Sequence, residues 1–444
     1  MPRRLPLFAT AARGTEDLLA DELAELGASR VRVDRGGVRF LANLNEALRI
    51  ALWSRIAMRL LWPLGESEVH GAEGLYEAAR AVPWEEHLDR RATFAVEATL
   101  RDSEHGHSGF VALKIKDALV DRLRERRGGR PDVDTRRPDV RVVAHLAGAH
   151  LSLSLDLAGA PLHRRGYRVR PTVAPVKETL AAAILRAVGY EGEEPLVDPL
   201  CGSGTFLVES GLVAARRAPA LRRTLGIERW PSLGAEARAA LDRLREEARA
   251  NERQPPFPIR GFDRDPDAVA AARANVRAAG LERAVSLAEA DATRPLPLGD
   301  LDHGLLVTNP PYGDRLAQGG QKGMKTFYFH LGERLGALPG FRLAVLSGNP
   351  AFEAAFHHRP VRRRALWNGP IACTLLEYPA RAAPGPGRQR RTSDPGLAAP
   401  EQPPDVAPVG PEHGEEEHRG QRGERRRGPG HEPGDGDRDD AGEQ

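Results

Sequence analysis

Hydrophobic and polar positions follow two different patterns along the chain, and the change comes near residue 160. Before residue 160, the pattern predicts short helices that alternate with short strands. Thr15–Leu26 places leucines on one helical face, and in Val31–Phe40 apolar and polar residues alternate around a Gly-Gly pair, as in a hairpin. Ala112–Arg124 predicts another amphipathic helix, and strand-like runs follow at Val140–Leu146 and His150–Leu157. We therefore expect a small α+β unit in this part of the chain.

From Lys177 onward, helical segments alternate with short apolar runs of the kind that form a buried parallel sheet. Between the first two runs, Ala235–Arg253 is typical of a long charged surface helix, and a late pair of runs around a Gly-Pro step predicts an antiparallel hairpin at the sheet edge. We expect a doubly wound α/β domain whose ligand crevice lies at the carboxyl ends of the strands. The predicted strands are Pro195–Pro199, Pro258–Asp263, Val285–Ala290, Gly304–Thr308, Arg342–Ser347, Arg364–Asn368 and Cys373–Tyr378.

The last part of the chain has a different composition. After Pro379 it is rich in Pro, Gly, Arg and Glu, with few large apolar residues, so residues 381–444 are predicted to be a disordered tail. Ten arginines and fourteen carboxylates give this tail a net charge of −4. Because the whole chain has a net charge of +3, residues 1–380 have a net charge of +7. A basic folded part fits a polyanionic partner, although many enzymes of small molecules are equally basic.

The few cysteines and the absence of long apolar segments indicate in which compartment the protein works. The only cysteines, Cys201 and Cys373, cannot form a disulfide framework or a four-ligand zinc site, so no metal is expected. The basic start lacks the apolar stretch of an export signal, and no apolar segment is long enough to cross a bilayer. A soluble, cytoplasmic protein is therefore expected.

A glycine loop stands where the first strand of the second region should turn into a helix. Glycines there let the backbone approach a ligand and direct helix amides toward it. A dinucleotide site would need a third glycine, but this sequence has Phe206 and Leu207 instead. S-adenosylmethionine carries cationic sulfonium and ammonium groups, so an acid beside the loop suits it. The predicted cofactor-binding residues here are Asp198, Pro199, Cys201, Gly202, Ser203, Gly204 and Thr205.

Acids also follow the next two predicted strands. Asp263 is placed to accept both ribose hydroxyls of a nucleoside, with Asp265 as a nearby competitor, and Asp291 is placed to accept the adenine amino group. Any one of them alone is more often a surface or capping acid. Acids at three successive strand ends favour a nucleoside-containing cofactor.

Asn309, Pro310, Pro311 and Tyr312 follow the fourth strand and form the most specific motif of the chain. The prolines fix the backbone and remove donors, so acceptors beside Asn309 can face a ligand rigidly. Two acceptors on a base amino group favour the tetrahedral nitrogen needed for attack. Tyr312 offers a face on which an extruded base can stack. These four residues are the predicted catalytic residues.

Some basic residues are weaker candidates for RNA contact. Arg164, Arg165 and Arg168 mix with an aromatic residue just before the second region, although an exposed basic linker is equally plausible. Lys114 and Lys116 lie on a predicted helix, where solvated lysines are the commoner case.

Several of these motifs together resemble the bacterial large-subunit ribosomal RNA guanine-N2 methyltransferases that carry a THUMP domain. The likeness runs from Phe8 to about Tyr378 and includes Thr10–Gly14, Leu52–Arg55, Leu113–Ala118, Arg130–Asp134, His163–Arg168, Ala174–Leu180, Asp198–Thr205, Asn309–Leu316 and Asn368–Pro370. The resemblance implies a ferredoxin-like piece at residues 1–43, a THUMP RNA-binding domain at 44–157 and a class I methyltransferase domain at 158–380.

The resemblance further implies methylation of the exocyclic N2 amine of a guanine, in 23S rRNA or a large-subunit assembly intermediate. Similar THUMP enzymes act on tRNA guanine, so tRNA stays open as the substrate. Some relatives carry a second, fused methyltransferase, and we expect that activity to be absent here. A non-catalytic RNA-binding assembly factor stays open as a second hypothesis, as does a DNA adenine or protein glutamine methyltransferase, because both use the same tetrapeptide.

Overall fold

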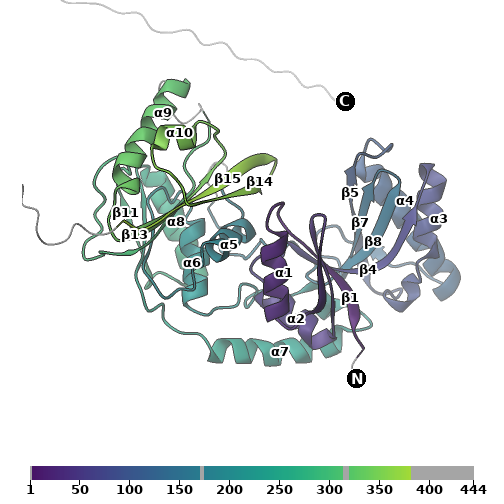
Figure 1. The fold of residues 1–444 in the computed structure, drawn as a ribbon. Helices are drawn as coiled ribbons and strands as arrows, with labels where there is room; N and C mark the ends of the chain where they lie inside the picture. Colours follow the sequence, from purple (N-terminus) through teal and green to yellow (C-terminus); the bar gives the residue numbers. More distant parts are fainter. Residues whose placement is uncertain (1–2, 171–174, 314–319, 382–444) are drawn as a thin grey trace, which may run out of the picture. The chain divides into compact units, whose positions relative to one another are not determined.

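The computed structural model describes residues 3–170, 175–313 and 320–381 (Figure 1). Residues 382–444 of the predicted tail, Ala174 and the end of the Asn309–Leu316 motif lie outside the described residues. Within the described part of the chain, no helix combines the length and the apolar character needed to cross a membrane.

The described residues before 160 form one mixed sheet with the strand order β2-β3-β1-β4-β8-β7-β5-β6. Strand β4 (Arg59–Glu68) pairs with the first strand, β1 (Leu5–Thr10), on one side and with β8 (His150–Asp156) on the other, so it joins the ferredoxin-like and THUMP segments in one sheet. The other strands are β2 (Ser29–Asp34), β3 (Gly37–Ala42), β5 (Thr93–Arg101), β6 (Asp132–Val133) and β7 (Val140–Ala147). The helices are α1 (Glu16–Glu25), α2 (Leu44–Trp53), α3 (Gly71–Ala81) and α4 (Ser108–Arg127).

The second sheet has the order β11-β10-β9-β12-β13-β15-β14. Its first five strands are parallel, and β15 pairs antiparallel with β13 and with β14, as the predicted edge hairpin requires. The strands are β9 (Leu196–Asp198), β10 (Ile259–Asp263), β11 (Val285–Glu289), β12 (Gly304–Thr308), β13 (Phe341–Ser347), β14 (Arg362–Asn368) and β15 (Ile371–Tyr378). The reversal of strand order between β9 and β12 places the ligand crevice at their carboxyl ends.

Helices cover both faces of the second sheet, which confirms the doubly wound prediction. One core contains residues of α5 (Glu178–Ala187), α6 (Thr205–Ala214) and α8 (Pro266–Ala279). A separate core on the other face contains residues of α9 (Gly320–Leu331) and α10 (Phe352–Phe356), with a π-helical turn, Gly332–Gly336, between these helices. The sheet is therefore buried on both faces, as its continuous apolar runs require.

Helix α7 (Gly234–Ala250) has the exposed, charged face that the sequence predicted for this segment. On its other face, Ala237, Leu241 and Leu244 are buried in the core of the first sheet, and the helix packs against α2. The small apolar residues recur every three or four positions among the charges, which is the pattern of a helix with one buried face. Helix α7 thus attaches the second region to the first.

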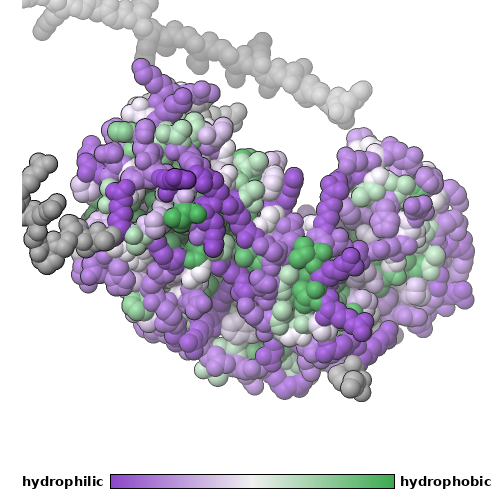
Figure 2. Space-filling model, in the orientation of Figure 1, coloured by the Kyte–Doolittle hydropathy of each residue, from purple (hydrophilic) through white to green (hydrophobic). Residues whose placement is uncertain are grey.

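Large hydrophobic side chains are few on the surface. The face drawn in Figure 2 is mostly hydrophilic, with small separate hydrophobic patches. Exposed large hydrophobic residues among those described are spread over several elements, from Val33 to Ile371. Isolated residues of this kind are normal on a folded surface.

Candidate functional site

The sheet register brings the predicted motifs together. Strands β9 and β12 are parallel neighbours, with Leu196 opposite Leu305 and Val197 opposite Leu306. The glycine loop after Asp198 and the turn that begins at Asn309 therefore leave the same edge of the sheet side by side. Strand β10 lies on the other side of β9, and β11 lies next to β10, so Asp263 and Asp291 belong to the same edge.

The glycine loop has the backbone conformation that its sequence suggests. Gly202 and Gly204 have φ angles of 51° and 79°, in the left-handed region that favours glycine. A Cβ atom on Gly204 would lie 3.2 Å from the Cβ of Ala272 in α8, so a side chain there would crowd the packing. Helix α6 begins directly after Gly204 and presents its N-terminal amides at this edge.

Asp198 is buried at the end of β9, with 2% of its surface exposed. Its carboxylate accepts a hydrogen bond from the Leu200 amide at 3.1 Å. Burial raises the pKa of Asp198 to about 8, against the opposing effect of that amide and of Thr308, and the nearby Asp263 adds to the rise. A buried carboxylate of this kind is stabilised by a cation placed beside it.

Asp263 holds the glycine loop in place. Its Oδ2 accepts a hydrogen bond from the Gly202 amide at 2.9 Å, and its Oδ1 accepts one from the Asp265 amide at 3.0 Å. Asp265 itself caps α8 through the Asp267 amide at 2.9 Å. Of the two competing acids, Asp263 is thus the one in contact with the loop.

Asp291 is partly exposed beyond β11. Burial alone would raise the pKa of its carboxyl, but hydrogen bonds from the Thr293 amide, at 2.9 Å, and hydroxyl, at 2.7 Å, outweigh burial and lower it. Both of these bonds go to Oδ1. Asp291 is therefore ionised at neutral pH, as an acceptor for an amino group requires.

The turn after β12 is fixed by hydrogen bonds from neighbouring elements. The Asn349 side chain donates to the Tyr312 carbonyl at 2.9 Å, and the Tyr328 hydroxyl donates to the Pro311 carbonyl at 2.5 Å. The Tyr312 hydroxyl donates to the side-chain oxygen of Asn309. Burial, with a smaller contribution from Cys373, raises the pKa of Tyr312, so this hydroxyl stays protonated and able to donate.

Three family models match the chain. Residues 165–377 match the RMKL-like methyltransferase domain, residues 70–156 the THUMP domain and residues 6–61 the RlmL ferredoxin-like domain. The crystal structure of SMU.472, named as a methyltransferase and complexed with SAH, is 30% identical with a TM-score of 0.77; the match covers 86% of this chain and 100% of that one. The chain belongs to the THUMP-domain class I methyltransferases. The ferredoxin-like match extends to residue 61, beyond the bound at 43 drawn from the sequence.

Two further relatives carry different names. The methyltransferase is 44% identical over 390 residues to the ribosomal RNA large subunit methyltransferase K/L of Syntrophotalea carbinolica, a match that covers 85% of this chain and 54% of the relative. It therefore spans about half the length of the curated relatives that it matches. A Listeria monocytogenes structure named as an N6-adenine-specific DNA methylase is 28% identical, with a TM-score of 0.73, over 85% of this chain and 97% of that one.

The structure gives Arg168 a different environment from the weak RNA contact predicted from the sequence. Arg168 does not face solvent as a simple RNA contact: it donates to Ser203 and Thr205 in the glycine loop, each at 3.0 Å, and to Glu178 at 2.8 Å. Buried Asn275 adds a bond to the Ser203 carbonyl at 2.9 Å. The motif was visible in the sequence, but only the fold shows that Arg168 bonds the glycine loop.

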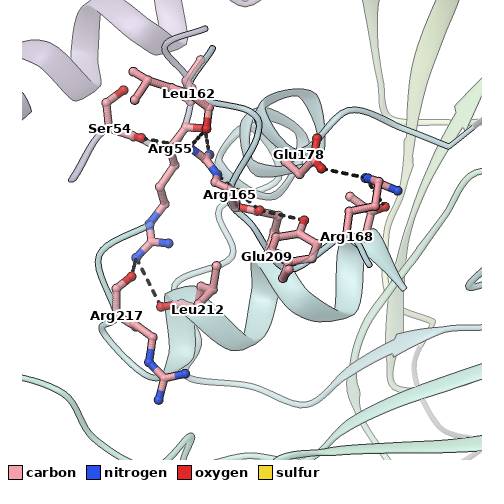
Figure 3. Close-up of polar contacts among 12 residues, drawn as sticks. Ser54, Arg55, Leu162, Arg165, Arg168, Glu178, Glu209, Leu212 and Arg217 are labelled. Carbon is pink, nitrogen blue, oxygen red and sulfur yellow. Dashed lines mark hydrogen bonds and ion pairs between the residues drawn. The ribbon is translucent and has the colours of Figure 1, made fainter. Parts of the chain in front are cut away.

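Arg165 also has a different role from the one expected. It is buried, its Nε lies 3.5 Å from Glu209 of α6, and it donates to the carbonyls of Leu162 and Arg55 (Figure 3). Tyr167 donates to the same Glu209 carboxylate at 2.9 Å. Because Arg165 is buried and both of its Nη atoms donate to carbonyls inside the protein, it is not available to RNA.

Arg55 completes this buried cluster from the N-terminal region. It donates to the carbonyls of Leu212, at 3.2 Å, and Arg217, at 2.9 Å, close to the end of α6 (Figure 3). Burial lowers the pKa of Arg55 to about 10, and burial raises that of Glu209 against the two arginines. The cluster thus joins α6, the helix that follows the glycine loop, to the ferredoxin-like region.

The remaining weak RNA candidates stay accessible. Arg164 is exposed, Lys114 lies 6.0 Å from the ring centre of Phe110, and Lys116 pairs with Asp117 at 2.7 Å.

Among the residues that the structure describes, no group of three metal-ligating side chains lies close enough to hold an ion.

Proposed function

We propose that this protein transfers a methyl group from S-adenosylmethionine to the exocyclic N2 amine of a guanine in RNA, with 23S rRNA as the first candidate, in the cytoplasm. The observation that supports this most directly is the juxtaposition of the glycine loop after β9 with the Asn309–Tyr312 turn after β12. The glycine loop has the residues expected to bind the cofactor, and the Asn309–Tyr312 turn has those expected to bind an amino group. The two motifs follow neighbouring strands.

The residues at the sheet edge fit the cofactor chemically. S-adenosylmethionine supplies an electrophilic methyl group on a positively charged sulfur. Asp198, whose pKa burial raises to about 8, would gain a cation beside its carboxylate, and the loop glycines would leave room for close approach. Asp263 and Asp291 would accept hydrogen bonds from the nucleoside part. Pro199, Cys201, Ser203 and Thr205 would line or support the same loop.

The Asn309 turn would orient the base. Its side-chain oxygen and the Pro310 carbonyl would accept both hydrogens of the amine, which turns the nitrogen lone pair toward the methyl group. Attack leaves a positively charged, acidic nitrogen, whose proton passes readily to water. The Tyr312 hydroxyl occupies the Asn309 oxygen in this structure, so the base must displace that contact when it enters.

RNA is supported as the substrate by the THUMP match at residues 70–156 and by the names of the curated relatives. A DNA adenine methyltransferase is the second candidate, because a structure with that name shares the fold at 28% identity. The THUMP match lies in the N-terminal region, which Arg55 and α7 join to the catalytic region, and this arrangement favours RNA. The THUMP match is also compatible with a guanine in tRNA as the target, and with a non-catalytic role in ribosome assembly.

Transfer of tritium from labelled S-adenosylmethionine would separate these candidates. The full chain is incubated with rRNA from cells that lack the enzyme, with tRNA, with DNA and with protein. We expect label in rRNA alone, recovered as N2-methylguanine at one position. Label in DNA as N6-methyladenine, or cofactor binding without transfer to any acceptor, would contradict the proposal.

A further inference from the structure

Arg13 of the ferredoxin-like region lies over the ring of Trp367, with its guanidinium carbon 3.9 Å from the ring centre. We infer that this arginine binds a backbone phosphate of the substrate RNA next to the target nucleotide. The N-terminal region would then complete the substrate site. The inference rests on the proposed function, since it takes RNA as the substrate.

The backbone beside Arg13 is attached to strand β14. The Gly14 carbonyl accepts hydrogen bonds from Arg364 Nε at 3.1 Å and Nη2 at 3.0 Å. Gly14 has a φ angle of +88°, and a Cβ atom there would lie 2.4 Å from the Ala365 carbonyl oxygen. Only glycine permits this close approach, so the position of Arg13 is set by the contact between the two regions.

Trp367 lies near the tip of the β14–β15 hairpin, at the catalytic edge of the sheet. Thr374 pairs with Ser347, the last residue of β13, so the residues from Trp367 to Ala372 extend past the carboxyl end of β13. A Cβ atom on Gly348 would lie 2.7 Å from the Tyr312 ring and 3.0 Å from Ile371. Ile371 in the hairpin tip is therefore a close neighbour of Tyr312, and Trp367 lies one register position from Ile371, opposite Ala372.

The charge of Arg13 is free for a ligand. Its side chain is exposed, and within the described ranges no carboxylate pairs with it. Neighbouring arginines on β14 differ, because Arg364 pairs with Asp17 and Arg363 with Glu353. Stacking on an aromatic ring limits the freedom of a guanidinium and leaves its edge donors available, which suits bidentate binding of phosphate.

The test compares R13Q, R13K and W367L with R243Q, which removes an exposed arginine of α7 far along the chain from the hairpin. Methylation of the rRNA is measured over a range of salt concentrations, and cofactor affinity and thermal unfolding are measured for each protein. We expect R13Q to raise KM for RNA about tenfold and to reduce the slope of log(kcat/KM) against log salt by about 0.7, as loss of one phosphate contact predicts.

Cofactor affinity should be unchanged in R13Q, and R243Q should behave like the original protein. W367L keeps the charge, so it should raise KM with little change in the salt slope, and R13K should lie between. An unchanged KM and slope in R13Q would overturn the inference, and so would a lower unfolding temperature with an unchanged slope, which indicates packing only. If the unaltered protein fails to methylate RNA, the proposed function itself fails.

Discussion

The Tyr312 hydroxyl donates a hydrogen bond to the side-chain oxygen of Asn309, so the two ends of the turn after β12 are joined to each other. The oxygen that we propose as an acceptor for the guanine amine is thus held in a fixed position. Its partner is also the ring proposed to stack on the base. Entry of the base exchanges one hydrogen bond for another and does not leave a buried acceptor without a donor.

Replacing Asn309 should remove catalysis and spare the cofactor. In Asn309→Ala, the amine loses one acceptor, and we expect kcat to fall by at least about 100-fold, as when one oriented polar group is removed from an active site. Affinity for S-adenosylmethionine, measured by calorimetry, should stay within a few-fold. Unchanged turnover would contradict the role of Asn309.

Tyr312→Phe separates stacking from the hydroxyl contact. The variant keeps an aromatic face but frees the Asn309 oxygen, so we expect kcat to change by no more than about threefold, whereas Tyr312→Ala should lose about 1–3 kcal/mol of base stacking. Single-turnover methylation of the same RNA measures both. Equal losses in the two variants would show that the hydroxyl, not the ring, is the important group.

Cofactor binding should depend on pH through Asp198. Its pKa is about 8 in the free protein, and a neighbouring cation lowers it, so binding below pH 8 releases a proton. Affinity for S-adenosylmethionine should therefore rise with pH from about 6 and level off near 8. Calorimetry in buffers of different ionisation enthalpy measures the released proton, and Asp198→Asn should release none. An equal proton release in that variant would assign the effect to another group.

The same shift predicts how Asp198 affects folding. Its pKa is raised in the folded protein, so the carboxyl contributes most to stability below its unfolded pKa, and the contribution falls as pH rises toward 8. Asp198→Asn should flatten this part of the stability profile.

Arg168 should act on the cofactor and not directly on RNA. Arg168→Gln removes the charged donors that hold Ser203 and Thr205, and we expect the Kd for S-adenosylmethionine to rise about tenfold, or ~1.4 kcal/mol. Arg164→Gln is the matched control, because it removes an exposed arginine four residues earlier and should leave that Kd unchanged. If the variant changes only KM for RNA, Arg168 contacts RNA, as the sequence predicted.

Glu209 should matter for stability. Glu209→Ala leaves the buried Arg55 and Arg165 without their carboxylate, which costs roughly 3–5 kcal/mol when one partner of a buried ion pair is removed. Urea unfolding measures this loss. Glu25→Ala is the control, because its pair with Arg186 is largely exposed and should contribute less than about 1 kcal/mol.

Local patterns in the sequence determined much of the fold and the contents of the site. Short runs of five or six residues predicted every strand of the second sheet. The central runs are apolar because a strand buried on both faces needs uninterrupted apolar side chains, and the edge hairpin followed from its Gly-Pro step. The glycine loop, the acids after β10 and β11 and the Asn309 turn were all identified from residue chemistry. Their proximity also followed, since parallel strands end at one edge. Their individual roles stay predictions.

Tertiary structure alone decided how the regions join and which cations are free. Arg165 and Arg168 are charged residues in a basic stretch, and nothing in their order along the chain distinguishes them from exposed Arg164. Their burial depends on Glu209, Ser203 and Glu178, which come from elements 10 to 44 residues away. In the same way, Arg13 meets Trp367 only because β14 and the start of α1 pack together. Periodicity reports which face of an element is apolar, but contacts between distant charges depend on packing that no local pattern encodes.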